Sequence, residues 1–245
     1  MKRLFLIWMV FLISACGVPE VATIAPTPEA IHVSYPQALQ AWADRFSNCA
    51  SSDPLVALYY NQSPSLDRHI FSNEVVLILG EPEQTGPASY LAEIGREQLA
   101  VIVNAENAES QFSSEQLRSI FSGRVLNWES DLDKPIQVWV FPDGDPARGI
   151  FDRVVIPSGS ITSQAMLAPD PGVMLEAIAG DADAIGYLPA SILASGNPTL
   201  VGNVKVIQVD ESLELELDQP VIAVTTNEPQ GLLRSMLVCL QAPSP

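Results

Sequence analysis

The chain has 245 residues, of which 47% are hydrophobic and 17% charged, and its formal net charge at pH 7 is −17. This hydrophobic share can bury one large core or two modest ones, so we expect order over most of the length. A strongly negative chain repels nucleic-acid phosphates and anionic lipid surfaces. The charge therefore argues against a role in binding nucleic acid.

The N-terminus has the pattern of a lipoprotein signal peptide over residues 1–16. Lys2 and Arg3 form a positive region, an apolar run follows, and the residues up to Cys16 resemble a bacterial lipobox. Cleavage there would leave Cys16 as a lipid-modified N-terminus, which predicts anchoring at the extracytoplasmic face of the cell membrane. Residues 17–30 contain three prolines and no apolar period, so they are expected to form a tether.

The first part of the body alternates predicted strands with a helix. Residues 31–34, 55–60 and 75–79 are short apolar runs typical of strands. Pro36 opens a helix whose apolar face consists of Leu39, Trp42, Ala43 and Phe46. This alternation predicts an α/β fold with a parallel or mixed sheet covered by helices.

A longer motif begins at residues 99–103, a branched apolar run typical of a buried strand, and turns at Asn104. Ser113 is a predicted N-cap, and Gln116 three positions later completes a capping box. The helix is expected to end at Gly123. Its apolar stripe consists of Leu117, Ile120 and Phe121.

A second helix start is predicted directly after a strand. Residues 135–141 alternate as a strand does, and residues 142–144 form a turn. Asp145 is the predicted N-cap, with Pro146 at the first helical position. The free N–H groups and the dipole of such a helix start favour an anion.

Further along, residues 171–179 are predicted to form a helix that ends at Gly180. Residues 184–187, Ala-Ile-Gly-Tyr, are predicted to form a strand in which Gly186 lets the backbone pass close to its neighbour. Residues 204–209 are expected to be one more strand.

The last predicted elements begin with an acidic run, residues 211–218, expected to be an exposed edge segment. Residues 220–225 form a second apolar crossing strand. Residues 230–240 form a closing helix with an apolar stripe.

Several of these segments together resemble the phosphate-binding-protein-like (PstS-like) family of ABC-importer substrate-binding proteins. They are the strand at 99–103, the helix SSEQLRSIFSG, the Asn-Trp pair at 127–128 and the Ile-Gly-Tyr strand. The resemblance implies an α/β, two-lobed periplasmic-binding-protein-like fold of type II with two crossover strands. It places residues 31–103 and 221–245 in lobe 1 and residues 104–220 in lobe 2. It also implies a monomer that closes on a small ligand and meets an ABC-transporter permease.

The resemblance points to loops that meet the ligand. In the family the loop after the first strand carries small hydroxyl residues, and here it consists of Ser34, Tyr35 and Pro36. The family also has an acidic residue ahead of a strand in this lobe. Glu74 and Glu81 are alternative counterparts, and the sequence does not choose between them.

The second ligand loop departs from the family. Phosphate binders have an arginine and a Ser-Gly-Thr triplet where this chain has Asp143, Gly144, Asp145 and Arg148. A capping aspartate occupies N–H donors that phosphate would use, and Asp143 would repel a dianion. Arg148 offsets this effect if it points into the cleft, and otherwise it faces solvent. The candidate ligand-binding residues are therefore Ser34, Tyr35, Asp143, Gly144, Asp145 and Arg148.

The expected ligand is a small molecule or anion, with phosphate disfavoured by the two aspartates. The alternative function keeps the fold but removes transport. It is an accessory or sensor lipoprotein that binds a protein partner, and the altered loop favours it.

No catalytic residue, cofactor or metal ligand is predicted. His32 and His69 have no nucleophile at a recognisable elbow, and G-x-S-x-G, H-E-x-x-H and P-loop motifs are absent from the sequence. Asp181 and Asp183 lack the spacing of an EF-hand loop.

Two cysteines remain in the body: Cys49 is predicted to follow the first helix, and Cys239 to lie in the last one. Outside the cytoplasm such a pair is more often bridged than free, and a bridge here would close a loop of nearly the whole body. The alternative is a pair of buried thiols that pack as small apolar side chains.

Overall fold

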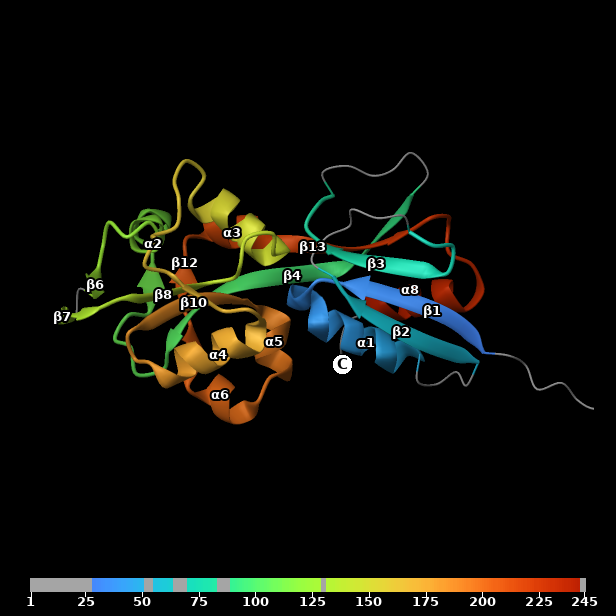
Figure 1. Ribbon diagram of the computed structural model, residues 1–245, viewed down its shortest axis with the longest axis horizontal. Coiled ribbons are helices and arrows are strands. Elements are labelled where there is room, and N and C mark those ends of the chain that lie inside the picture. Colours follow the sequence, from blue (N-terminus) through green and yellow to red (C-terminus); the bar gives the residue numbers. More distant parts are fainter. Residues whose placement is uncertain (1–27, 51–54, 64–69, 83–88, 129–130, 243–245) are drawn as a thin grey trace, which may run out of the picture.

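The computed structural model describes residues 28–50, 55–63, 70–82, 89–128 and 131–242. The predicted signal peptide with Cys16, and the tether up to residue 27, lie outside these residues. The predicted tether is too long at its other end, because Glu29 and Ala30 belong to the first strand. Two groups of strands and helices lie side by side, joined by β4 (Tyr90–Asn104) and β13 (Asp218–Thr225) (Figure 1). None of the helices in the described ranges is both long enough and apolar enough to cross a membrane.

The first group, which we call the first lobe, is built on a sheet with the order β2-β1-β3-β13-β4. Its remaining strands are β1 (Glu29–Tyr35), β2 (Val56–Gln62) and β3 (Glu74–Leu79). Strand β1 runs parallel to both β2 and β3, whereas β13 is antiparallel to β3 and β4. The helices of this lobe are η1 (Gln37–Leu39), α1 (Gln40–Ala50) and α8 (Gly231–Gln241).

The second group, the second lobe, continues from the far half of β4. That half pairs antiparallel with β10 (Ala184–Pro189) and β11 (Val204–Val206). Strand β8 (Gln137–Val140) is parallel to β10 and to β9 (Met166–Leu167). The helices are α2 (Ser114–Phe121), α3 (Pro146–Val155), α4 (Pro171–Gly180), α5 (Ala190–Ser195), α6 (Pro198–Gly202) and α7 (Glu211–Leu217).

Two short ribbons complete the second lobe. The first pairs β5 (Gln111–Phe112) with β12 (Gln208–Val209), and the second pairs β6 (Asn127–Trp128) with β7 (Asp131–Pro135). The connecting strand β4 changes partner between Gln98, which faces Asp218 of β13, and Leu99, which faces Pro189 of β10. The strand thus begins at Tyr90, well before the apolar run at 99–103, because β13 pairs with its first half. That half is only partly buried, so it has no apolar run that the sequence could show.

Both predicted helix starts are present. Ser113 and Gln116 form the capping box of α2 in both directions, and Gly123 follows that helix with a positive φ of 73°. Asp145 caps α3, and Pro146 is its first residue. Local hydrogen bonding therefore sets where these two helices begin.

Three local predictions are wrong. The acidic run at 211–218 forms α7 and the start of β13 rather than an exposed edge, because Leu213 and Leu217 are buried on one side of the helix. Residues 204–209 break into β11 and β12, which join different sheets, with buried Ile207 between them. Cys49 lies inside α1 rather than after it.

Gly186 has a different role from the predicted one. A Cβ there would come within 2.5 Å of the Met174 sulfur and within 3.3 Å of Ile178, both on α4. The nearest backbone atom, the carbonyl oxygen of Trp139, would be 3.5 Å away. The glycine therefore makes room for helix α4 on the sheet, rather than for a neighbouring strand.

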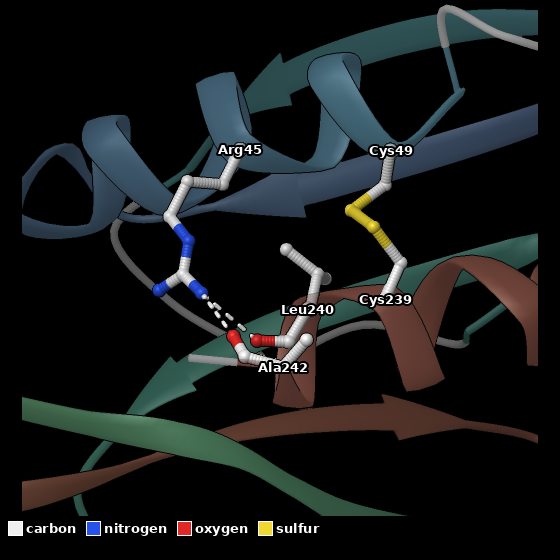
Figure 2. Close-up of a disulfide and its surroundings, with 5 residues drawn as sticks. All are labelled: Arg45, Cys49, Cys239, Leu240 and Ala242. Carbon is white, nitrogen blue, oxygen red and sulfur yellow. Dashed lines mark hydrogen bonds between the residues drawn. A yellow bond between two sulfur atoms is a disulfide. The ribbon is translucent and has the colours of Figure 1, made fainter. Parts of the chain in front are cut away.

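Cys49 of α1 and Cys239 of α8 are joined by a disulfide, so the pair is bridged (Figure 2). Arg45, one turn earlier on α1, donates hydrogen bonds to the carbonyls of Leu240 and Ala242 at the end of α8, at 2.9 and 3.4 Å. The first and last helices of the body are thus fastened to each other covalently and by hydrogen bonds.

Candidate functional site

A cavity of about 450 Å³ opens between the two lobes. It lies where parallel strands of both lobes end: β1 and β2 on one side, β8 and β9 on the other. Ligands of α/β proteins commonly bind outside the carboxyl ends of parallel strands, because the connecting loops meet there. The residues that line the cavity are Gln37, Gln62, Pro142, Asp143, Gly144, Asp145 and Pro169.

The first lobe supplies two amide side chains to this cavity. Gln37 begins η1, two residues after β1 ends, and Gln62 is the last residue of β2. Strands β1 and β2 are parallel and in register, with Tyr35 opposite Gln62, so both amides reach the same edge of the sheet. Each amide can donate and accept hydrogen bonds.

The second lobe supplies the turn between β8 and α3. Gly144 has a positive φ of 86°, a conformation that glycine adopts without strain. Asp145 Oδ1 accepts hydrogen bonds from the backbone N–H groups of Ala147 at 2.8 Å and Arg148 at 3.3 Å. Two of the donors at the start of α3 are therefore already used by a side chain of the same chain.

The two aspartates of this turn have different surroundings. Asp143 is almost fully exposed, with 97% of its side chain accessible. Burial raises the pKa of the Asp145 carboxyl, and the hydrogen bonds from Arg148 and Ala147 act in the opposite direction. Both carboxyls border the cavity, so this wall presents acceptor oxygens.

Arg148 does not line the cavity. Its guanidinium donates to the carbonyl oxygen of Phe141 at 2.7 Å and to Asp152 at 2.6 Å, and only 11% of the side chain is exposed. A weaker contact of 3.7 Å joins it to Asp143. Of the two orientations that the sequence left open, inward to the cleft or outward to solvent, neither is adopted, because the side chain folds back beneath the strand end.

Ser34 and Tyr35 are buried and do not line the cavity either. Ser34 is 2% exposed and donates a hydrogen bond to Glu74 Oε1 at 2.7 Å. The Tyr35 hydroxyl donates to Gln40 at 3.0 Å, and its ring packs edge-on against Tyr60. Burial raises the pKa of Tyr35. Both residues therefore support the end of β1 from within.

The two candidates for the acidic residue of the first lobe, Glu74 and Glu81, differ in their surroundings. Glu74 is buried and also accepts from the N–H of Phe71 at 3.2 Å, whereas Glu81 is exposed beyond the end of β3. Neither of them borders the cavity.

Gln37, Gln62 and Pro169 border the cavity although the sequence did not single them out. The sequence did contain a signal for these residues, since each lies at or just after the end of a parallel strand, where ligands commonly bind. It could be applied only once the strand order was known, because the sequence does not show which strand ends share an edge. Among the described residues that line the cavity, none is a lysine, arginine or histidine.

The remaining candidates for chemistry lie elsewhere. His32 stacks on Tyr59 with ring centroids 5.1 Å apart, and His69 lies outside the described residues. Asp181 accepts a hydrogen bond from the N–H of Asp183, so this pair forms a turn. The described residues contain no group of three or more His, Cys, Asp or Glu placed to hold a metal ion.

A two-lobed α/β fold with a cleft between strand ends defines a class of binding proteins. Residues 83–235 match the PBP superfamily domain. Because the match spans more than half of the chain, the protein belongs to the PBP superfamily.

Solved structures share this fold. A protein described as a phosphate ABC transporter substrate-binding protein, with bound phosphate, from Clostridium perfringens is similar with a TM-score of 0.69 and 18% identity, over 86% of this chain and 92% of that one. An ABC-type phosphate transport receptor from Vibrio cholerae gives 0.61 and 13%, over 86% and 93%. The reduced OxyR regulatory domain from Pseudomonas aeruginosa gives 0.63 and 11%, over 89% and 99%. At these identities the likeness shows the fold alone.

Proposed function

We propose that this protein is an extracytoplasmic solute-binding protein of an ABC importer, held at the cell membrane by a lipid on Cys16. The observation that carries the proposal is the cavity between the lobes, to which both lobes contribute polar side chains. Membership of the PBP superfamily supports it, as does the likeness of the fold to phosphate transport receptors. The expected partners are a small ligand and the importer's permease.

Closure of the lobes on the ligand is the expected mechanism. Strands β4 and β13 connect the lobes, so a change in their twist would alter the width of the cavity. A ligand favours the closed form only if it gains contacts there, and one that touches both walls does so. We propose Gln37, Gln62, Asp143, Gly144 and Asp145 as contacts and Ser34, Tyr35 and Arg148 as supporting residues.

The proposed site is altered relative to a phosphate site. Asp145 occupies two N–H groups of the α3 start, Arg148 is directed to Phe141 and Asp152, and Asp143 adds a negative charge. A phosphate dianion would meet repulsion without a free cation among the described lining residues. The proposed ligand is therefore a small solute other than phosphate.

Calorimetric titration of the purified protein tests this proposal. Phosphate is expected to give no binding heat, whereas a screen of small solutes by thermal shift is expected to find a compound that raises the unfolding temperature. Saturable phosphate binding would contradict the altered site. A hit that is unaffected by Gln62→Ala and Asp143→Ala would contradict the placement of the site.

An accessory or sensor role is the alternative, in which the protein binds a protein partner rather than a transported solute. The altered site favours it, because a cleft without lysine, arginine or histidine among its described lining residues has lost a feature that an anion carrier needs. A solute screen without a hit, together with a defined partner cross-linked through the rim of the cleft, would support this role over transport. Catalysis is not proposed for either role.

A further inference from the structure

Glu97 occupies an unusual position for an acidic residue, because it is 2% exposed at the point where β4 passes from one lobe to the other. It faces Gln219 of β13 in the first-lobe sheet, and two residues later Leu99 faces Pro189 of β10 in the second-lobe sheet. Buried carboxylates are rare unless they are paired or hydrogen-bonded. The partners of Glu97 therefore indicate what it does.

The two carboxylate oxygens of Glu97 accept hydrogen bonds from different lobes. Oε2 accepts a hydrogen bond of 2.6 Å from the indole Nε1 of Trp42, on α1 of the first lobe. Oε1 accepts one of 3.0 Å from the backbone N–H of Ser191, on α5, which follows β10 in the second lobe. Helices α1 and α5 also pack against each other. One carboxylate thus bridges the two lobes at their junction.

The first-lobe end of this bridge is firmly held. The Trp42 ring lies against Gly95, where a Cβ would come within 2.3 Å of it. The Arg45 guanidinium also contacts the Trp42 ring, 4.2 Å from its centre. Arg45 in turn donates hydrogen bonds to carbonyls at the end of α8 (Figure 2). The disulfide between Cys49 and Cys239 fixes α1 to α8 as well. Trp42 cannot easily follow a moving second lobe.

At the second-lobe end of this bridge, one buried polar atom lacks a hydrogen bond among the described residues. Ser191 Oγ is buried and has no hydrogen-bond partner among the described residues, although its own backbone N–H is bonded to Glu97. A rotation of the second lobe about β4 would shift Ser191 relative to Trp42. It would then break one of the two bonds and leave a buried carboxylate with fewer donors, which is unfavourable.

We infer that Glu97 is a hinge clamp, a positioning residue that holds the two lobes at the separation seen here by binding Trp42 and Ser191 at once. The inference goes beyond the proposed function, since it holds whatever occupies the cleft. Loss of the clamp is expected to widen the range of lobe separations in the absence of any ligand.

The test measures lobe separation by spin labels at Phe71→Cys and Leu167→Cys, two exposed positions, one on each lobe. The full chain carries Cys16→Ser, so the introduced thiols are the free ones once Cys49 and Cys239 are bridged. Glu97→Gln is expected to broaden or shift the distance distribution, because one of the two accepting oxygens is replaced by an NH2 group, which cannot accept a hydrogen bond. It should also speed amide exchange of Ser191 about tenfold, as loss of one hydrogen bond predicts.

Two further variants complete the test. Glu93→Gln, on the same strand but exposed, removes the same charge and should keep the original distribution. Trp42→Phe removes the indole donor and should reproduce the broadening, which keeps the inference testable if Glu97→Gln does not fold. A merely structural role would lower the unfolding temperature and leave lobe separation unchanged. That result in the folded variants would overturn the inference, without bearing on solute binding.

Discussion

The guanidinium of Arg148 donates a hydrogen bond of 2.7 Å to the carbonyl oxygen of Phe141, at the end of β8. This bond directs the side chain of Arg148, in the first turn of α3, away from the cavity. The same guanidinium also donates a hydrogen bond of 2.6 Å to Asp152 Oδ2, one helical turn further along α3. The charge that borders the cleft is consequently that of Asp143 and Asp145.

The first prediction concerns these two aspartates. In the double variant Asp143→Ser and Asp145→Ser, phosphate binding is expected to become detectable, with an affinity at least about tenfold above that of the natural protein. Two like charges leave the cavity wall, while serine still caps α3. Calorimetric titration with phosphate measures the change. The control is Asp210→Ser, which removes one aspartate outside the cavity, where its carboxylate accepts hydrogen bonds from Ser114. Equal phosphate affinity in the double variant and the control would contradict the explanation.

The second prediction is a dependence of stability on pH. Burial raises the folded-state pKa of Asp145 above its ordinary value of 3.8, so the folded protein binds this proton more tightly than the unfolded chain does. The contribution of Asp145 to the free energy of unfolding is therefore greatest at low pH and falls as the pH rises from 3.8 through the raised pKa.

Asp145→Asn isolates this contribution, because asparagine keeps the capping oxygen and cannot titrate. The free energy of unfolding of the natural protein minus that of the variant should increase as the pH is lowered through this window. Urea unfolding at a series of acidic pH values measures it. A difference that stays constant, or that decreases toward low pH, would show that burial does not dominate at this carboxyl.

The third prediction concerns the disulfide. Cys49 and Cys239 are 190 residues apart in the sequence, and the chain-entropy model gives such a bridge about 5 kcal/mol as an upper value. The double variant Cys49→Ala and Cys239→Ala should lose about 2–5 kcal/mol of unfolding free energy. Denaturant unfolding provides the measurement. A reducing agent should destabilise the natural protein to a similar extent and leave the variant unaffected.

The fourth prediction compares two glycines. Gly95→Ala would place a methyl group 2.3 Å from the Trp42 ring, and overpacking of this kind costs about 1–3 kcal/mol. Gly149→Ala, inside helix α3 and with no atom within 4 Å of the new carbon, should stabilise by about 0.5–1 kcal/mol. Thermal unfolding of both variants checks the opposite signs. A neutral Gly95→Ala would mean that the Trp42 ring moves aside freely.

Local patterns were sufficient for many of the elements. The caps at Ser113 and Asp145 were predictable because their hydrogen bonds join residues two or three positions apart. The acidic run at 211–218 was not, since its helix depends on Leu213 and Leu217 packing against other parts of the chain. Similarly, the first half of β4 lacks a clear apolar pattern and forms a strand because β13 pairs with it.

The candidate site shows the same division. The amino-acid sequence by itself determined the turn at Asp143 to Asp145 and its departure from a phosphate loop. It also showed that Cys49 and Cys239 were available to pair, without deciding that they do. Only the tertiary structure decided that Gln37 and Gln62 form the opposite wall, that Arg148 turns away, and that Glu97 joins Trp42 to Ser191. The physical reason is distance along the chain. Caps and turns are fixed by neighbours in sequence, whereas the direction of a side chain at a strand end depends on which distant strands pack beside it.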